Sequence, residues 1–358
     1  MAQGVASAPA PQHSYREQGG PSDQGLPQRR EPHRHTYGAI DLGTNNCRLL
    51  IARPSEGGFT VIDAFSRIVR LGEGLTHTGA LSKEAMDRAV AALGICADKL
   101  RRRNVSLSRS VATEACRRAT NGGEFVARVL AETGIRLQII TAEQEARLAV
   151  MGCHALLEPG AGPALVFDIG GGSTELVLLE GGTDDLSGGA PTVGDWFSAP
   201  WGVVSLSESE PHIGDSEEEL RAAYARMRAR VDEAFAPFAA KLRDRGDEEG
   251  RRLLGTSGTV TTLASLHLDL PNYDRRAVDG LIVPAESMRA LCQRLGGLSV
   301  GARAELACIG TERADLVVAG CAILEAILDL WPAERLSVAD RGIREGILRA
   351  LMAHELRA

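Results

Sequence analysis

Residues 164–179 read Ala-Leu-Val-Phe-Asp-Ile-Gly-Gly-Gly-Ser-Thr-Glu-Leu-Val-Leu-Leu. Apolar runs at both ends, with three glycines and a serine between them, predict a buried strand, a tight loop and a second strand. Glycines allow the N–H groups of such a loop to converge on an anion such as phosphate. Two acids, Asp168 and Glu175, flank the loop and would repel a phosphate, so a hard cation such as Mg²⁺ is expected beside them. The alternative is a glycine-rich hairpin with two solvated acids.

A second stretch repeats this layout near the start of the chain, where residues 38–51 read Gly-Ala-Ile-Asp-Leu-Gly-Thr-Asn-Asn-Cys-Arg-Leu-Leu-Ile. The aligned pairs are Asp41 with Asp168, Gly43 with Gly170 and Arg48 with Glu175. Two copies of one strand–loop–strand unit indicate duplicated halves that hold one ligand between them. Neither copy carries the lysine of a Walker A loop, and neither opens a helix as a dinucleotide-binding loop does.

A third glycine loop lies at residues 253–259, Leu-Leu-Gly-Thr-Ser-Gly-Thr. Here the apolar pattern continues into a helix, expected at residues 260–267. The N–H groups at the start of that helix point out of its first turn, where they can meet an anion. Taken alone, this third signal is weak.

Composition bounds the class of protein. The 358 residues suffice for two domains, and 44% hydrophobic with 24% charged residues is typical of a soluble globular protein. No run of 18 apolar residues predicts a membrane span, and a net charge of −7 argues against nucleic acid as a partner. Seven scattered cysteines without a Cys-x-x-Cys pair predict reduced thiols in a cytoplasmic protein, not a disulfide or zinc framework. Residues 1–35 are poor in bulky apolar side chains and are expected to form a disordered tail without a secretory signal.

The rest of the chain alternates between strand and helix patterns, which predicts an α/β protein with a helix-covered sheet in each half. Strands are expected at residues 59–70, 110–113, 136–140 and 336–340, a loop at residues 181–194, and helices at residues 82–103, 285–296, 312–330 and 341–357.

Several residues carry signals for helix ends. Asn121, Thr141 and Ser216 are expected as N-caps, each followed three residues later by Glu or Gln. Pro237 is expected to kink or end the helix that begins after Ser216. Glu145 falls in the first turn after Thr141, where an acid favours the helix dipole without any catalytic role.

Several sequence motifs resemble those of a known protein family. In chain order they are Asp41-Leu-Gly-Thr-Asn45, Glu145-Ala-Arg147, Asp168-Ile-Gly-Gly-Gly-Ser-Thr-Glu175, Gly255-Thr-Ser-Gly-Thr259, Glu312-Arg-Ala-Asp315, Ala319-Gly320 and Arg344-Glu-Gly346. From about residue 37 to its C-terminus the sequence resembles the exopolyphosphatase / guanosine pentaphosphate phosphohydrolase (Ppx/GppA) family, in its short two-domain form.

That resemblance implies two ribonuclease-H-like α/β domains of the actin-like ATPase superfamily, with a cleft between them. After the tail, the first domain is expected at residues 36–146 and the second at residues 147–358, with the terminal helix able to pack back on the first domain. A homodimer is also implied.

The resemblance further assigns roles in the cleft. Glu145 becomes the base that orients or deprotonates the attacking water, which reverses the structural interpretation given above, and Arg117 becomes a catalytic arginine. The metal-associated acids would be Asp168, Glu175 and Asp41, with Mg²⁺ or another divalent cation. The phosphate-binding residues would be Gly43, Thr44, Asn45, Asn46, Cys47, Arg48, Gly170, Gly171, Gly172, Ser173, Thr174, Gly255, Ser257 and Gly258.

The implied reaction is release of orthophosphate from the end of inorganic polyphosphate. Guanosine pentaphosphate is an alternative substrate, because both present a phosphoanhydride end, and a non-catalytic sensor of polyphosphate or guanosine tetraphosphate is another alternative. An actin-like kinase would need adenosine and acceptor sites, neither of which the sequence identifies. Two departures stand out: Asn46 replaces a serine found in many members, and Gln144 replaces an acid found in some.

Overall fold

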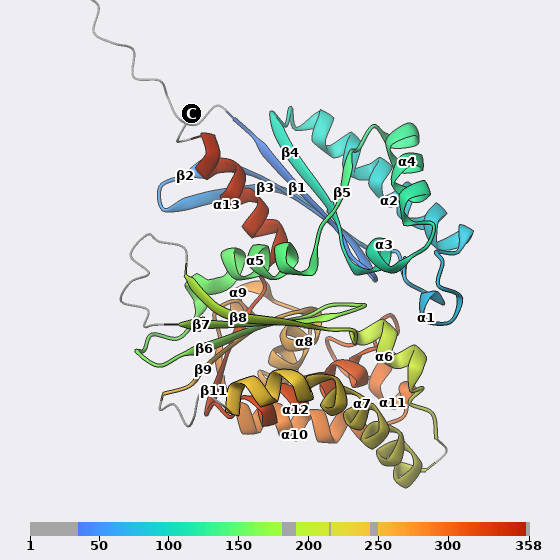
Figure 1. Ribbon diagram of the computed structural model, residues 1–358, viewed down its shortest axis with the longest axis vertical. Helices are drawn as coiled ribbons and strands as arrows, with labels where there is room; N and C mark the ends of the chain where they lie inside the picture. Colours follow the sequence, from blue (N-terminus) through green and yellow to red (C-terminus); the bar gives the residue numbers. More distant parts are fainter. Residues whose placement is uncertain (1–34, 181–190, 215, 244–249, 356–358) are drawn as a thin grey trace, which may run out of the picture. The chain divides into compact units, whose positions relative to one another are not determined.

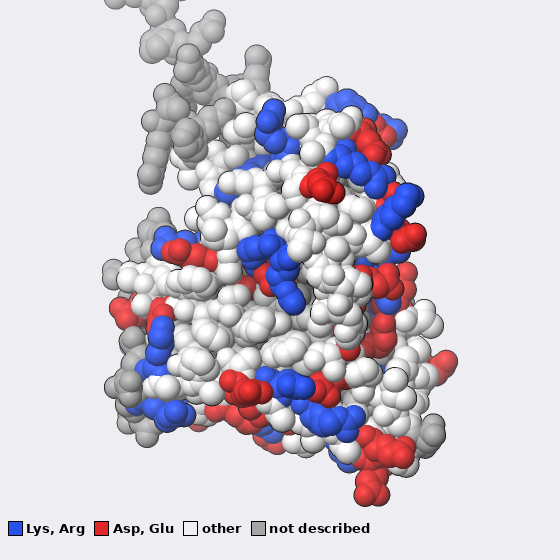
Figure 2. All heavy atoms as spheres, turned by 45° about the vertical axis from the view of Figure 1, so that its right-hand side comes forward, with Lys and Arg blue, Asp and Glu red and all other residues white. Residues whose placement is uncertain are grey.

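The computed structural model describes residues 35–180, 191–214, 216–243 and 250–355. The tail predicted at residues 1–35 lies outside these ranges apart from its last residue. Among the described residues, no helix is both long and apolar enough to cross a membrane. Figure 2 shows Lys and Arg interspersed with Asp and Glu on one face of the molecule.

The first lobe, residues 37–139, is built on a five-stranded sheet in the order β3-β2-β1-β4-β5. Its strands are β1 (Tyr37–Leu42), β2 (Asn46–Ser55), β3 (Gly58–Ile68), β4 (Leu107–Ala112) and β5 (Leu137–Ile139). The first three form an antiparallel meander, and β4 and β5 run parallel to β1. Apolar side chains of β1 and β2 pack against Val90 and Leu93 of α2. The helices of this lobe are α1 (Leu75–Thr78), α2 (Lys83–Arg102), α3 (Glu114–Arg118) and α4 (Gly122–Thr133).

The second lobe, residues 164–339, repeats this topology. Its sheet has the order β10-β11-β9-β6-β7-β8, in which β6, β7 and β8 form the meander and β9 and β11 run parallel to β6. The strands are β6 (Ala164–Ile169), β7 (Thr174–Glu180), β8 (Thr192–Ala199), β9 (Arg252–Thr256), β10 (Ile282–Pro284) and β11 (Arg335–Ala339). A meander followed by two parallel strands is the ribonuclease-H-like order. The predicted fold class and the duplication are therefore confirmed.

Helices of the second lobe cover one face of its sheet and form the largest apolar cluster of the described residues. Met227 of α7, Leu263 of α8 and Ile323 of α12 pack there with Phe167 of β6. These helices are α6 (Val203–Ser209), α7 (Glu217–Arg243), α8 (Gly258–His267), α9 (Arg275–Val278), α10 (Ala285–Gly296), α11 (Val300–Ala304) and α12 (Val317–Leu330).

Two helices, α5 (Ala142–Cys153) and α13 (Ile343–Glu355), lie between the two sheets in Figure 1. A short 3₁₀ turn, η1 (His154–Leu156), follows α5. Apolar residues of α5 pack on both sheets, while α13 packs on β1 and β2. The helices cross through glycines: a Cβ at Gly346 would lie 2.0 Å from the Leu148 carbonyl oxygen, and one at Gly152 2.0 Å from that of Gly342. Only glycine permits this approach.

Two of the three predicted N-caps are confirmed, by reciprocal bonds between Thr141 and Gln144 and between Ser216 and Glu219. Asn121 occupies the N-cap position of α4, but it makes no capping hydrogen bond, because its side chain instead bonds both backbone groups of Leu81, at 2.8 and 3.0 Å. Pro237 does not end α7, which continues to Arg243.

Strand β8 was also missed. It begins at Thr192, inside the loop predicted at residues 181–194.

Candidate active site

A cavity of about 140 Å³ lies where the two glycine turns face each other across the lobes. In the first turn Gly43 N donates to Asn46 O at 2.9 Å, and in the second Gly170 N donates to Ser173 O at the same distance. The strands leading into the turns also match, since Asp41 pairs with Arg48 and Asp168 with Glu175. The repeat predicted from the sequence is therefore a repeat in hydrogen bonding.

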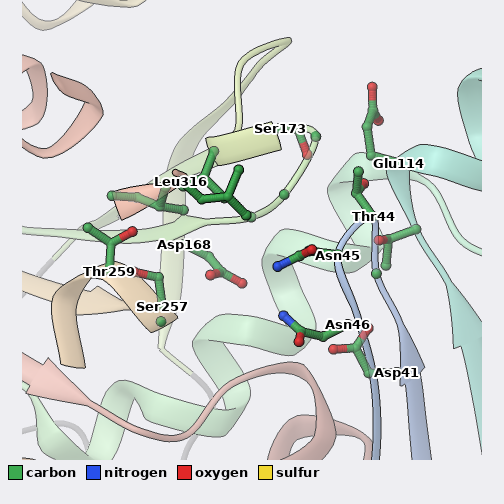
Figure 3. Close-up of a pocket in the computed structure, with 18 of the residues that line it drawn as sticks. Asp41, Thr44, Asn45, Asn46, Glu114, Asp168, Ser173, Ser257, Thr259 and Leu316 are labelled. Carbon is green, nitrogen blue, oxygen red and sulfur yellow. The ribbon is translucent and has the colours of Figure 1, made fainter. Parts of the chain in front are cut away.

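The turns approach each other so closely that only glycine fits on one side. A Cβ at Gly171 would lie 2.9 Å from Thr44 Cβ, and one at Gly172 would lie 2.7 Å from Thr44 Oγ1. Figure 3 shows Asp41, Asn45 and Asn46 facing the cavity from the first lobe and Asp168 from the second. A ligand in this space is in reach of both turns at once.

Most of the predicted site residues line this cavity. They are Asp41, Gly43, Thr44, Asn45, Asn46, Arg48, Glu145, Asp168, Gly170, Gly171, Gly172, Ser173, Ser257 and Gly258. Ser257 also caps α8, because its Oγ accepts from Val260 N at 3.0 Å. The first residues of α8 therefore present their N–H groups at the cavity.

Three residues predicted to bind phosphate do not line the cavity: Cys47, Thr174 and Gly255. Alternation along β2 turns Cys47 away from the cavity into the core, where its Sγ lies 4.0 Å from that of Cys96. The Thr174 hydroxyl donates to the carbonyl of Trp201 at 2.7 Å. Gly255 lies in β9, where a Cβ would meet the Phe167 ring at 2.4 Å.

Burial raises the pKa of three acids that line the cavity, Asp41, Glu145 and Asp168. It also raises the pKa of Glu175, which pairs with Asp168 across the second turn but does not line the cavity. The pKa of Asp168 rises to about 8 because of burial and then the neighbouring charges of Glu145 and Asp41. For Glu175 the pKa rises to about 7 through burial and Asp168, against hydrogen bonds from Ser173 and Ser198. Burial raises the pKa of Asp41 despite the nearby positive charge of Arg48. Four carboxylates cannot all be charged here without a cation.

The donor set fits a hard cation. Asp41 Oδ1 and Glu175 Oε2 are buried and lack a hydrogen-bond partner among the described residues. In that part of the chain no three His, Cys, Asp or Glu side chains are grouped closely enough to hold a metal by themselves. Mg²⁺ matches such an arrangement, because it commonly takes one or two carboxylates and completes its shell with water and substrate phosphates.

Glu145 lines the cavity, and only 6% of the residue is exposed. Burial and then the charge of Glu175 raise its pKa well above the usual range, while Arg117 acts in the opposite direction. Nη1 and Nη2 of Arg117 both donate to Glu145 Oε2 at 3.2 Å. Arg117 itself does not line the cavity; it holds the carboxylate that does.

Sequence reasoning missed several lining residues, among them Thr113, Glu114, Thr259, Thr262 and Arg313. Two of them lie in quoted motifs, Thr259 in Gly255-Thr-Ser-Gly-Thr259 and Arg313 in Glu312-Arg-Ala-Asp315. Arg313 Nη1 donates to Thr262 Oγ1 at 3.2 Å. The others come from elements whose patterns indicate only secondary structure.

Comparison with known proteins decides the family. A profile of the Ppx/GppA phosphatase family matches residues 50–355. The chain belongs to the Ppx/GppA phosphatase family. It is 33% identical over 327 residues to exopolyphosphatase 2 of Mycobacterium tuberculosis, an alignment that covers 87% of this chain and 97% of that protein.

Solved structures agree. A Ppx/GppA family member from Aquifex aeolicus superposes with a TM-score of 0.69 at 27% identity, over 90% of this chain and 98% of that one. An exopolyphosphatase from Cytophaga hutchinsonii gives a TM-score of 0.77 at 24% identity, over 89% and 98% of the two chains, and so shares the fold. The resemblance seen in the sequence is confirmed.

In this Ppx/GppA phosphatase, the two residues that differ from the family's motifs, Asn46 and Gln144, lie in different places. Asn46 lines the cavity between Asn45 and Arg48, where its amide replaces a hydroxyl. Gln144 closes the α5 capping box, its Oε1 accepting from Thr141 N at 3.1 Å, and does not line the cavity.

Proposed function

We propose that this protein is an exopolyphosphatase that releases terminal orthophosphate from inorganic polyphosphate. One observation carries the proposal: a buried carboxylate, Glu145, lines a small cavity to which two matching glycine turns contribute from opposite lobes. The similarity to exopolyphosphatase 2 of Mycobacterium tuberculosis supports it.

Binding of the terminal phosphate falls to groups from both lobes. N–H groups of the turns at Gly43 and Gly170 and of the α8 N-terminus supply donors, and Arg48 supplies positive charge. Because the remaining charged groups are mainly acids, an added cation is needed to bind a polyanion. One or two of the acids Asp168, Asp41 and Glu175, together with water and substrate phosphates, would hold Mg²⁺, which when bound would neutralise charge on the transferred phosphoryl group.

Glu145 then acts on water. Its carboxylate accepts a proton as the water oxygen forms a bond to the terminal phosphorus, while the bond from that phosphorus to the bridging oxygen breaks. Orthophosphate and a chain one unit shorter are the products. Arg117 keeps the Glu145 carboxylate oriented and favours its charged form, which opposes the effect of burial.

A substrate panel tests this function. Phosphate release by the purified protein would be measured with polyphosphates of several lengths, guanosine pentaphosphate and ATP in parallel, each with Mg²⁺ and with excess chelator. We expect Mg²⁺-dependent release from polyphosphate with the highest kcat/KM. Preference for guanosine pentaphosphate would move the assignment to the 5′-phosphohydrolase activity. Binding of polyphosphate without release from any substrate would indicate a sensor, and full activity in chelator would rule out the metal arrangement.

A further inference from the structure

Glu114, the first residue of α3, is a cavity-lining acid that the proposed chemistry leaves unused. Its side chain is 13% exposed, and its Oε2 accepts from Arg117 Nε at 3.0 Å and from Arg117 Nη2 at 2.5 Å. A carboxylate in this position gains nothing from a phosphate ligand. Its partner is the arginine.

The contacts of Arg117 account for all its N–H groups. Nε donates to Glu114, one hydrogen each of Nη1 and Nη2 is directed to Glu145, Nη2 also donates to Glu114, and Nη1 donates to the Ile140 carbonyl at 2.7 Å. A guanidinium has five N–H donors in a fixed fork. Its orientation toward Glu145 therefore depends on the two bonds that Glu114 accepts.

Glu114 also touches the opposite lobe. A Cβ at Gly172 would lie 2.9 Å from Glu114 Cγ, so the methylene part of Glu114 packs against the second glycine turn. In Figure 3 the Glu114 carboxylate points away from the space between Asn45 and Asp168. The methylene groups of Glu114 therefore contact the second glycine turn, and its carboxylate binds Arg117.

We infer that Glu114 is a positioning residue that acts through Arg117 to orient the base Glu145, and that its seat against Gly172 ties this orientation to the second glycine turn. The inference rests on the proposed role of Glu145. Without Glu114, two donors of Arg117 lose their acceptor and the guanidinium is free to turn from Glu145 toward a bound phosphate. Substrate binding is then kept or tightened, while the chemical step slows.

The experiment is a double-mutant cycle on phosphate release from polyphosphate with Mg²⁺. The variants are Glu114→Ala, Glu114→Gln, Arg117→Ala and the double variant Glu114→Ala/Arg117→Ala, with kcat, KM and melting temperature measured for each. We expect Glu114→Ala to lower kcat about 10- to 100-fold, the size of effect that misplacement of a catalytic group produces. KM should stay the same or fall. Glu114→Gln, which keeps an acceptor oxygen, should recover part of the loss, and the double variant should be no slower than Arg117→Ala.

Arg118→Gln is the matched control. Arg118 lies in the same helix and reaches the other oxygen of Glu114 only at 3.9 Å, so its removal should change kcat less than about twofold. Wild-type kcat in Glu114→Ala, a rise in KM alone, or multiplying losses in the double variant would overturn the inference. If Arg117→Ala and Glu145→Gln also keep wild-type turnover, the proposed function fails first, and this inference fails with it. Glu114→Gln preserves side-chain volume and serves as the test if the alanine variant does not fold.

Discussion

Replacing Asp168 by Asn should stabilise the metal-free protein at alkaline pH, although it removes a proposed metal ligand. The folded protein holds the pKa of Asp168 at about 8, against an ordinary value of 3.8, because of burial and the charges of Glu145 and Asp41. Between these two pH values the folded state keeps a proton that the unfolded state has released. The free energy of unfolding therefore falls as pH rises from about 4 to 8.

The shift of about four pKa units, at about 1.4 kcal/mol per unit, sets an upper limit of roughly 6 kcal/mol. Neighbouring acids share the same protons, so we expect about 2–3 kcal/mol for Asp168→Asn at pH 8.5 in excess chelator. That corresponds to a melting temperature raised by about 4–8 °C. At pH 5, where the wild-type carboxyl is protonated, the two proteins should melt within about 1–2 °C. Saturating Mg²⁺ at pH 8.5 should stabilise the wild type more than the variant.

Differential scanning calorimetry at the two pH values, with chelator and with Mg²⁺, measures these differences. Asp63→Asn is the control of opposite sign, because hydrogen bonds from Lys99 and Arg103 lower the pKa of Asp63. Its loss should destabilise the protein similarly at pH 5 and pH 8.5, since both lie above the titration of that group. A wild type as stable as Asp168→Asn at pH 8.5 in chelator would show that the acids at the cavity do not repel one another as argued.

Two further expectations concern packing and the tail. Gly346→Ala should lower the free energy of unfolding by about 1–3 kcal/mol, because its Cβ would meet the Leu148 carbonyl oxygen where α5 and α13 cross. Gly94→Ala, in the middle of α2 where no atom lies near the added Cβ, should raise it by about 0.5–1 kcal/mol. Equal melting temperatures for the two variants would contradict this account of the helix crossing. Deleting residues 1–35 should leave melting temperature and turnover nearly unchanged, because that segment has too little apolar surface to join a core, and a large loss of either would show that it is part of the folded protein.

The sequence was most informative where a local pattern dictates hydrogen bonding. Both glycine turns and the acids beside them follow from residues 38–51 and 164–179, because a strand–glycine–strand pattern admits few backbone arrangements. The pairing of Asp41 with Arg48 and of Asp168 with Glu175 bears out the alignment of the two copies. The division into domains at residue 146 and the homodimer remain predictions.

Other features depended on contacts between distant segments. Cys47 follows Asn46 in a motif, yet strand alternation places it in the core beside Cys96. Asn121 carries a capping signal, but Leu81, forty residues earlier, offers it two better-placed bonds. Glu114 contacts both Arg117 and Gly172, and no local pattern in the sequence indicates that these residues meet. Single-sequence patterns contain no information on such pairs.

Turnover of Glu145→Gln tests the central claim most directly. The substitution keeps the volume of a side chain that is 6% exposed but removes its basicity, so it should act on the chemical step. Glu143→Gln, two residues earlier in α5 and paired at the surface with Arg147, is the control for any loss of helix-dipole stabilisation. A positioned base contributes about 10²–10⁴-fold. We predict that phosphate release from polyphosphate falls at least about 100-fold in Glu145→Gln, with binding retained, and stays near wild type in Glu143→Gln; wild-type turnover by folded Glu145→Gln would contradict the assignment of Glu145 as the base.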